Sequence, residues 1–396
     1  MAGRGARRTI LVCTGTRAEF GLLRPVMRAI AARRGLRLRV AVLGAHLLGP
    51  ARTVREVEAE FEIAARVPMQ RGGNAGSAGR QSLRTQRLED ARALGRGVSG
   101  CAAVLEEINP DCVVVLGDRI EALAAALAAS VGGVPVAHIH GGDRAEGIAD
   151  EAMRHALTKL AHLHFAASAA SARRIIAMGE ARGTVFNVGS PALDGLMEIE
   201  AMGDEEAAAL GDPRAVVLLH PSGLEMGAEA ALTRSVLTAV KRAGVRMLAL
   251  MPNSDAGREE IAGVLKRAGS EGAVQVEHHL ERARFIALLK RLAQPDAEGR
   301  RGFLIGNSSA GLIEGSALRV PVINAGPRQG GRERGGNVID VAAGGTISAR
   351  ELGRAIERAV RMRPRAKTPY GKGDSGERIA AILERAALSV RKRNTY

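Results

Sequence analysis

Acidic and histidine side chains gather in one stretch of the chain, residues 113–165. An apolar run at 113–116 stops at Gly117 and Asp118, and a second run at 134–137 ends in HIHGGD. Because ligands bind at the carboxyl ends of parallel strands in open α/β sheets, these two polar clusters predict one site. Carboxyl and imidazole groups there are suited to acid–base chemistry. The candidate catalytic residues are Asp118, Glu121, His140, Asp143, Asp150 and Glu151.

Some of these acidic residues also have a plain structural interpretation. Asp118 and Glu121 bracket the start of one expected helix, and Asp150 and Glu151 mark the start of another. Asp150 can be an N-cap, and a Glu in the first turn interacts favourably with the helix dipole. Arg154 lies one turn beyond Asp150 and could pair with it. The sequence leaves both interpretations of Asp150 open.

A metal site is the alternative use of the histidines. His138 and His140 alternate along an expected strand, which predicts that both rings point to one face, as metal ligands would. No further ligand is clearly placed on that face, and the glycines that follow suit a polar substrate better. We therefore expect no metal.

The loop at residues 306–311, GNSSAG, has the features of a phosphate site. It lies between an expected strand and an expected helix, where backbone N–H groups and small residues favour an anion. No lysine follows in the Walker pattern, so it is not a P-loop. The alternative is a tight strand-to-helix connection. A second Gly-rich segment, 326–332, adds Arg328 and Arg332 near the same strand ends.

Other strand ends supply further binding candidates. His220 is either structural or a partner of the phosphate, and Glu314 either accepts from a ribose or is a solvated helix charge. Asn253 and Asp255 follow the next strand, where an Asx turn is the simpler interpretation. The candidate substrate-binding residues are Arg17, His220, Asn253, Asp255, Ser308, Ser309, Glu314 and Arg328.

Alternating strands and helices must position these residues. The expected strands are 9–13, 36–43, 113–116, 134–137, 185–188, 215–219, 246–251, 302–305 and 320–324; the expected helices are 22–33, 88–108, 228–243, 258–268 and 376–392. Two successive sets of parallel βα units imply an α/β protein with two Rossmann-like domains facing a cleft. We expect an N-terminal domain at 1–205, a C-terminal domain at 206–375, and a last helix, within 376–396, that crosses back. The segment 71–85 is expected to be a mobile loop.

Length and composition agree with two domains of a soluble protein. The chain has 396 residues, of which 46% are hydrophobic and 25% charged. No apolar run is long enough to span a membrane, and the Arg-rich start leads directly into a strand, unlike a signal peptide. We therefore expect a cytoplasmic protein without a membrane partner. Cys13, Cys101 and Cys112 show no CxxC spacing, which indicates reduced structural thiols.

The net charge of +15 fits either nucleic acid or an anionic small substrate. The arginines are spread over the chain, however, and with 6 Phe, 2 Tyr and no Trp there is little for bases to stack on. We expect no nucleic-acid partner. Most of the charge is interpreted as a compositional bias towards Arg, with a minor part that serves phosphate groups.

Seven ordered motifs resemble those of the hydrolysing UDP-N-acetylglucosamine 2-epimerases, bacterial enzymes that start sialic-acid synthesis by making N-acetylmannosamine. The motifs are TGTRAEFGLLRPVM, GDRIEALAAALAA, PVAHIHGGDRAEGIADEAMRHALTKLAHLHF, VFNVGSPALD, MPNSDAG, IGNSSAGLIE and GPRQGGRERGGNVIDV. The resemblance implies a GT-B fold, with the nucleotide held mainly by the C-terminal domain and the sugar facing the N-terminal one.

HIHGG followed by DE and RHALTKL is similar to the hydrolysing branch, since the non-hydrolysing branch carries a HVEAGLR-like stretch instead. The chain departs from the family pattern twice. Asp143 replaces a more usual Glu, which shortens the reach by one methylene, and residues 292–301 resemble a small insertion, expected in a surface loop.

The resemblance implies anti-elimination of UDP to a 2-acetamidoglucal, then water addition at C1 and reprotonation at C2. Asp118, Asp143 and Asp150 would share the acid, base and water-positioning roles, assisted by His140 and Glu121. Arg17, His220, Ser308, Ser309 and Arg328 would neutralise the diphosphate, and Glu314 would hold the ribose. No cofactor or metal is required, and a homodimer or homotetramer is expected.

Four alternatives stay open. The same reaction could act on a UDP-diacetamido-trideoxyhexose or on GDP-N-acetylglucosamine. The enzyme could be a non-hydrolysing 2-epimerase, or a GT-B glycosyltransferase, which would need an acceptor cleft. A basic nucleic-acid-binding protein is the alternative from another class.

Overall fold

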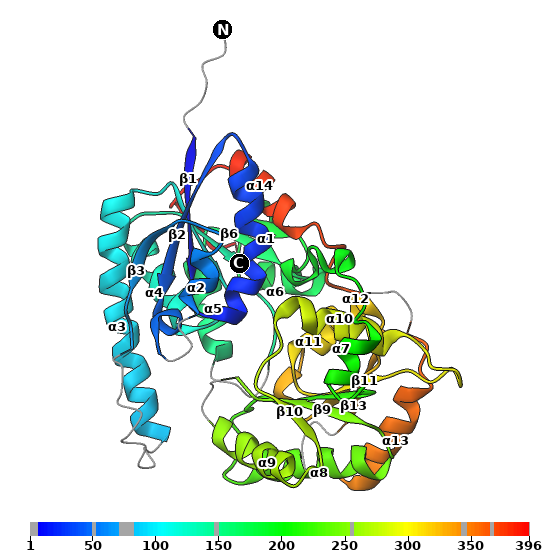
Figure 1. The fold of residues 1–396 in the computed structure, drawn as a ribbon. Coiled ribbons are helices and arrows are strands. Elements are labelled where there is room, and N and C mark those ends of the chain that lie inside the picture. Colours follow the sequence, from blue (N-terminus) through cyan, green and yellow to red (C-terminus); the bar gives the residue numbers. More distant parts are fainter. Residues whose placement is uncertain are drawn as a thin grey trace. The chain divides into compact units, whose positions relative to one another are not determined.

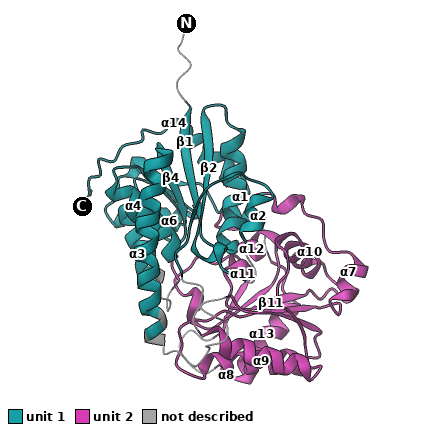
Figure 2. Cartoon of the chain, turned by 60° about the vertical axis from the view of Figure 1, so that its left-hand side comes forward, with its two compact units in different colours: residues 1–143, 150–194, 371–396 teal, residues 144–149, 195–370 magenta. Residues whose placement is uncertain are grey.

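The computed structural model describes residues 7–49, 53–70, 83–145, 150–253, 257–341, 347–364 and 368–395. The chain divides into two compact units (Figure 2). Unit 1 comprises Met1–Asp143, Asp150–Asp194 and Gly371–Tyr396, and unit 2 comprises Arg144–Ala149 and Gly195–Tyr370. Each unit contains one parallel sheet, which confirms the predicted α/β class.

Unit 1 has a seven-stranded sheet in the order β3-β2-β1-β4-β5-β6-β7. The strands are β1 Arg8–Thr14, β2 Leu36–Leu43, β3 Ile63–Val67, β4 Cys112–Leu116, β5 Val136–Ile139, β6 Leu163–Ala166 and β7 Val185–Asn187. From β1 the order runs outwards in one direction through β2 and in the other through β4. The carboxyl ends of β1 and β4 therefore form a topological switch point, where open α/β sheets bind ligands.

Helices cover both faces of this sheet (Figure 1). They are α1 Arg17–Ala32, α2 Val54–Glu58, α3 Leu83–Ile108, α4 Ile120–Val131, α5 Asp150–Leu160, α6 Ala169–Ala177 and α14 Ser375–Arg385. One core packs α1, α2 and α14 against the sheet, and the other packs α3, α4 and α5 against its opposite face. The buried strands are nearly continuous apolar runs, as expected of a parallel sheet covered on both sides.

The chain returns to unit 1 at its end, and α14 packs along α1 (Figure 1). Two glycines with positive φ precede α14, and a Cβ on Gly371 would lie 2.9 Å from Gly189 Cα, and one on Gly373 2.8 Å from Leu193 O. The glycines therefore let this segment approach the backbone after β7 closely. Residues 371–376 match the string G-x-G-x-x-G. In a dinucleotide-binding motif a strand leads directly into this string, but the described residues just before 371 form no strand, so close packing explains these glycines.

Unit 2 has a six-stranded parallel sheet in the order β10-β9-β8-β11-β12-β13. The strands are β8 Ala215–Leu218, β9 Met247–Leu250, β10 Gln275–Glu277, β11 Phe303–Gly306, β12 Val322–Ala325 and β13 Val338–Val341. The helices are α7 Asp204–Ala209, α8 Ala228–Arg242, α9 Arg258–Ser270, α10 Arg282–Ala293, α11 Ser309–Leu312, α12 Glu314–Leu318 and α13 Ala349–Val360. The core on one face contains side chains of α8, α9 and α13. The switch point of this sheet lies between β8 and β11.

Several predicted boundaries were wrong. The strand expected at 134–137 is β5, Val136–Ile139, because a turn with Gly133 at φ 72° precedes it. The last helix ends at Arg385 instead of 392, and α1 starts at Arg17 instead of 22. β3, β6, β10 and β13 were not predicted. Of the expected loop 71–85, residues 83–85 begin α3, and the rest lies outside the described residues.

Three further features bear on expectations from the sequence. The three cysteines are buried and unpaired. Of the segment 292–301, Leu292 and Ala293 end α10, and the rest forms a largely exposed turn closed by a bridge between Pro295 and Arg301. Within the described ranges, no helix is both long and apolar enough to cross a bilayer.

Candidate active site

An ion pair lies at the carboxyl end of β4 in unit 1. The Arg154 guanidinium, on α5, donates through Nη2 to the Asp118 carboxylate. Its Nη1 donates to the carbonyl oxygen of Asp143 at 3.0 Å. The Asp118 side chain is 16% exposed and that of Arg154 5% exposed. Asp118 is thus held by a cation while its side chain stays partly open to solvent.

His140 follows the end of β5 and is held at both ring nitrogens. Its backbone is left-handed, with φ 66°. Nδ1 lies 3.0 Å from Asp143 Oδ2, and Nε2 lies 3.0 Å from Ser190 Oγ. A carboxylate can only accept, so the neutral ring donates from Nδ1 and accepts the Ser190 hydroxyl at Nε2. The ring is therefore fixed in one tautomer by a buried network.

Asp143 is fully buried within that network. Its second oxygen accepts from the Ser171 hydroxyl at 2.7 Å, and Ser171 is itself bonded to Ser168. With 0% exposure, the carboxylate orients His140 and faces no solvent.

The prediction that the rings of His138 and His140 point to one face of a strand was wrong. His140 lies beyond the end of β5 and has a left-handed backbone, so strand alternation does not apply to it. His138 donates from Nε2 to Gly117 O at 2.7 Å, and burial lowers its pKa to about 4. No group of three metal-ligating His, Cys, Asp or Glu side chains occurs in the part of the chain that the structure describes.

Glu121 lies in the first turn of α4, which follows β4, and is 1% exposed. Its carboxylate accepts from the Gln70 amide at 3.1 Å and the Ala45 N–H at 3.4 Å, and it pairs with Arg119 at 3.4 Å. A Cβ on Gly15 would lie 2.3 Å from Glu121 Cβ, so glycine is required beside it. Glu121, which follows β4, thus contacts the segments after β1, β2 and β3.

Glu19 is a second buried carboxyl group, which sequence reasoning missed. Thr16 and Glu19 form the capping box of α1, in which Glu19 Oε2 accepts from the N–H groups of Gly15 at 2.8 Å and Thr16 at 3.0 Å. Burial, and then the charge of Glu121, raise the Glu19 pKa to about 7. The T-x-x-E spacing after a strand was the signal available in the sequence.

The remaining candidates of unit 1 have other partners. Arg17 forms a half-exposed ion pair with Glu56 at 2.8 Å. Glu151 lies 3.6 Å from His155, one turn further along α5. Asp150 begins α5, but its side chain lies outside the described residues, so its predicted contact with Arg154 cannot be placed.

In unit 2, Asn307 joins the loops at the switch point. Its side chain is buried and accepts from the His220 N–H at 2.7 Å, while its amide donates to His220 O at 2.8 Å and to the Ser222 hydroxyl at 2.9 Å. The Asn307 carbonyl oxygen accepts from Gln329 Nε2 at 2.8 Å and from Arg328 Nη1 at 3.4 Å. Three strand-end loops therefore meet at one asparagine.

Several sequence-predicted binding residues lie on the loops that this asparagine joins. His220 Nδ1 accepts from the Asn253 N–H at 3.2 Å, which leaves Nε2 as the protonated nitrogen of the neutral ring. Arg328 donates to Pro221 O at 3.2 Å. Ser308 is the N-cap of α11, and Ser309 is its first residue. Asp255 lies outside the described residues.

Glu314 is not a solvated helix charge. It is 6% exposed and accepts from Arg282 Nη1 at 3.2 Å. The loop before it depends on Gly306, whose φ is 152° and where a Cβ would lie 1.9 Å from Leu218 O. The loop therefore passes so close to β8 that only glycine fits.

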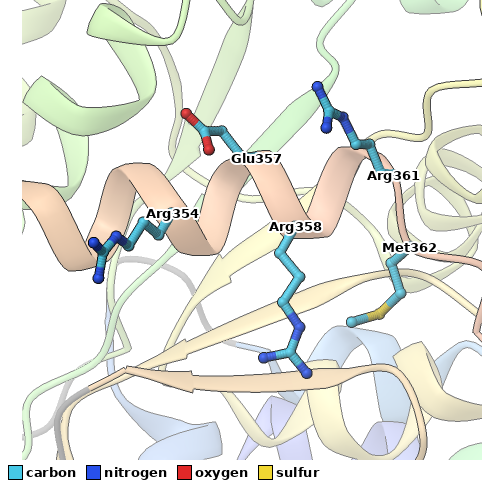
Figure 3. A pocket seen from close by; sticks show the side chains of 5 residues that line it. All are labelled: Arg354, Glu357, Arg358, Arg361 and Met362. Atoms are coloured by element: carbon cyan, nitrogen blue, oxygen red, sulfur yellow. The ribbon is translucent and has the colours of Figure 1, made fainter.

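A surface hollow of about 490 Å³ lies elsewhere in unit 2, along α13 and just beyond its end (Figure 3). Arg354, Glu357, Arg358, Arg361 and Met362 line it. None of the predicted site residues takes part. The polar groups held by buried partners converge instead at the switch point of each sheet.

Comparison with solved structures shows the class of fold. The structure is similar to UDP-GlcNAc 2-epimerase from Neisseria meningitidis bound to UDP-GlcNAc, with a TM-score of 0.75 and 19% identity over 95% of this chain and 99% of that one. An epimerase from Listeria monocytogenes gives the same TM-score over 96% of each chain. Two Rossmann-like units of this kind define a GT-B fold.

The chain belongs to the UDP-N-acetylglucosamine 2-epimerase family, whose profile matches residues 28–384. It is 34% identical to the UDP-N,N'-diacetylbacillosamine 2-epimerase (hydrolyzing) of Legionella pneumophila, over 98% of this chain and 100% of that protein. It is 29% identical to the UDP-N-acetylglucosamine 2-epimerase of Neisseria meningitidis serogroup B, over 94% of each.

Proposed function

We propose that the protein is a hydrolysing 2-epimerase, which converts a UDP-linked 2-acetamido sugar and water into the free 2-epimer and UDP. The observation that carries this proposal is the partly exposed Asp118 side chain, held by Arg154 beside the His140 network at a switch point. Such a site suits proton transfer at a sugar carbon. The relative named as hydrolyzing, similar over its full length, supports the hydrolytic branch.

The proposed reaction has two steps. A base removes the C2 proton, a C1=C2 double bond forms, and the C1–O bond breaks with its electron pair leaving on the diphosphate. Water then adds its oxygen to C1, and a proton reaches C2 from the opposite face. The net change is one water consumed and one glycosidic bond broken, so neither an oxidant nor a metal is needed to balance the reaction.

We propose that unit 1 performs the proton transfers. Asp118 is assigned to act on the sugar directly, since its side chain is partly exposed, whereas the fully buried Asp143 acts through His140. Asp150 shares the acid, base or water-positioning role. Glu121 assists through its buried contacts with the segments after β2 and β3.

We propose that unit 2 binds the nucleotide. Cations and helix N–H groups stabilise a diphosphate leaving group, which suits Arg328, His220, Ser308 and Ser309, with Arg17 as a further cation from unit 1. Glu314 is assigned to the ribose. A GT-B glycosyltransferase would use a similar nucleotide site, but it would release no free sugar without an acceptor.

Two sugars are candidates for the substrate. UDP-N-acetylglucosamine, giving N-acetylmannosamine, is expected from the motifs. UDP-N,N'-diacetylbacillosamine is supported by the 34% identity to the Legionella relative, against 29% for the Neisseria one. We expect the diacetamido sugar to give the higher kcat/KM when both are compared.

The test is proton NMR of each UDP-sugar incubated with the enzyme alone in deuterated water. We expect UDP and free sugar in equal amounts, with deuterium at C2, because the proton removed is not the one returned. Accumulation of a UDP-linked 2-epimer would assign the protein to the non-hydrolysing type. No turnover of either sugar, or of GDP-N-acetylglucosamine, without an acceptor would contradict the proposal.

We further propose a cytoplasmic homodimer or homotetramer that binds neither nucleic acid nor membrane. The three unpaired, buried cysteines support a reducing compartment. Light scattering after size exclusion tests the oligomeric state, and titration with duplex DNA or RNA at moderate salt tests nucleic-acid binding.

A further inference from the structure

Asn307 touches every loop of unit 2 that carries a predicted ligand of the diphosphate, yet its own side chain is 0% exposed. Its side-chain amide is hydrogen-bonded to the backbone N–H and carbonyl oxygen of His220 and to the Ser222 hydroxyl. Both residues follow β8. Its backbone N–H donates to Leu218 O at 3.2 Å, and its carbonyl accepts from the two residues after Pro327. The asparagine is thus bonded to the loops after β8 and β12 from its own position after β11.

These contacts require an amide. The side-chain oxygen faces an N–H donor, and the side-chain nitrogen faces a carbonyl and a hydroxyl oxygen. Aspartate has the same shape, but its second oxygen would face the carbonyl oxygen of His220 at about the same distance. Since buried polar groups without partners are costly, the loops after β8 and β11 would separate or rearrange.

We propose that Asn307 is the positioning residue of the nucleotide site: it holds the loops of His220, Ser308 and Arg328 in register so that their donors converge on one diphosphate. This inference rests on the proposed function, because it assigns the ligand as UDP. Asn307 itself contacts no ligand in this assignment, and its effect passes through the loops that it joins. Loops that already hold their bound conformation bind the diphosphate more tightly, because less conformational entropy is lost on binding.

The first experiment is calorimetric titration with UDP of wild type and Asn307→Asp at about pH 8 and about pH 5. At the higher pH the ionised aspartate should raise the UDP Kd at least about tenfold. At the lower pH a protonated aspartate regains a donor towards His220 O, so the ratio of variant to wild-type Kd should fall towards one. A merely destabilised fold would not recover on acidification.

The charged and titratable groups nearest the asparagine are His220 after β8, Glu229 on α8, which accepts from the Ser222 N–H, and Arg328 after β12. All three groups are present in wild type and variant alike. The ratio of the two proteins at each pH therefore isolates the change at position 307.

Asn337→Asp is the matched control. Asn337 is also buried in unit 2, and its amide donates to Gly311 O at 3.2 Å, at the far end of the 306–311 loop, and to Val320 O at 2.9 Å, just before β12, so it does not join the loops of His220 and Arg328 as Asn307 does. It should lose comparable thermal stability but keep UDP affinity within about threefold. Equal loss of affinity in both variants would overturn the inference.

Gln329→Leu covers the case in which Asn307→Asp does not fold. It removes a buried donor to the Asn307 carbonyl and should weaken UDP several-fold at both pH values. If wild type binds UDP and both Gln329→Leu and Asn307→Asp keep wild-type affinity at the higher pH, the positioning role of Asn307 is wrong. The proposed function would not be affected by that result. A wild-type protein that does not bind UDP would overturn the proposed function as well.

Discussion

The Arg154 guanidinium pairs with the Asp118 carboxylate, and both side chains are largely buried. The pair joins α5 to the end of β4, two elements that are not adjacent in the chain. Through the Asp143 carbonyl, the same guanidinium also contacts the segment that holds His140. One cation therefore sets the relative positions of the two groups assigned to proton transfer.

Asp118→Asn should abolish turnover while leaving UDP affinity nearly unchanged, because the nucleotide is assigned to unit 2. The measurement is kcat beside a UDP titration, with thermal unfolding to confirm that the fold persists. Asp111→Asn is the control: Asp111 lies at the amino end of β4 and accepts from the Thr9 N–H at 2.7 Å. More than about a tenth of wild-type kcat in Asp118→Asn, a barrier change under about 1.4 kcal/mol, would remove Asp118 from the chemical step.

Glu19→Gln should gain stability relative to wild type as the pH rises. The Glu19 pKa is raised from 4.5 to about 7, so the favourable contribution of its protonated form is full below about pH 4.5 and is lost as the pH passes 7. A glutamine cannot ionise and keeps the oxygen that caps α1. The difference in unfolding free energy should grow by up to about 3 kcal/mol across this window.

Glu351→Gln provides a comparison of opposite sign. Ser348 and Glu351 form the capping box of α13, and hydrogen bonds to Ser348 lower the Glu351 pKa. This exposed carboxylate stabilises the fold at neutral pH and loses that effect on acidification. Urea unfolding between about pH 4 and pH 8 measures both variants. Parallel pH profiles would show that Glu19 is not protonated at neutral pH.

Gly306→Ala should destabilise unit 2 and reduce UDP binding. Its Cβ would overlap Leu218 O, so β11 and β8 must separate, at a cost of about 1–3 kcal/mol or more. Gly336→Ala is the control, since nothing lies within 4 Å of its Cβ. Thermal unfolding and a UDP titration test both. Wild-type behaviour of Gly306→Ala would mean that the loop path described here is incorrect.

His220→Ala and Arg328→Ala should each weaken UDP binding by roughly 1.5–3 kcal/mol without unfolding the protein, because each removes a charge-assisted contact to the diphosphate. Arg246→Ala removes an exposed arginine from the other end of unit 2's sheet, where it pairs with Asp212, and should leave the affinity unchanged. Calorimetry with UDP decides. If both site variants bind like wild type, the nucleotide lies elsewhere.

Much of the fold could be predicted because apolar runs and helix periodicity are local signals. The strand at Leu36–Leu43 was predicted to the residue. β10, Gln275–Glu277, was missed because it is three residues long and only half-buried, so it has no apolar run. The start of α1 was placed too late because Thr14 to Arg17 was interpreted as the turn into the helix, although the Thr16–Glu19 capping box begins the helix at Arg17.

The site was predictable in its composition but not in its contacts. Asp118 and His220 follow strands, so their location could be inferred from local pattern. Which groups hold them could not, because Arg154 and Asn307 reach them only after strands and helices far apart in sequence have packed. The burial of Asp143 and Glu121 has the same origin: the sequence showed carboxylates, and only the packing showed that they face the protein interior.

The return of the chain into unit 1 has a consequence for the order in which the protein is made. The strands of unit 1 leave the ribosome first, yet Ile379, Ala380 and Leu383 of α14, which complete the core beside α1, are synthesised after the whole of unit 2. Until then the apolar face of α1 that α14 will cover lies open to water and to other chains. Nascent unit 2 can therefore reach its native core before unit 1, although translation of unit 1 began earlier.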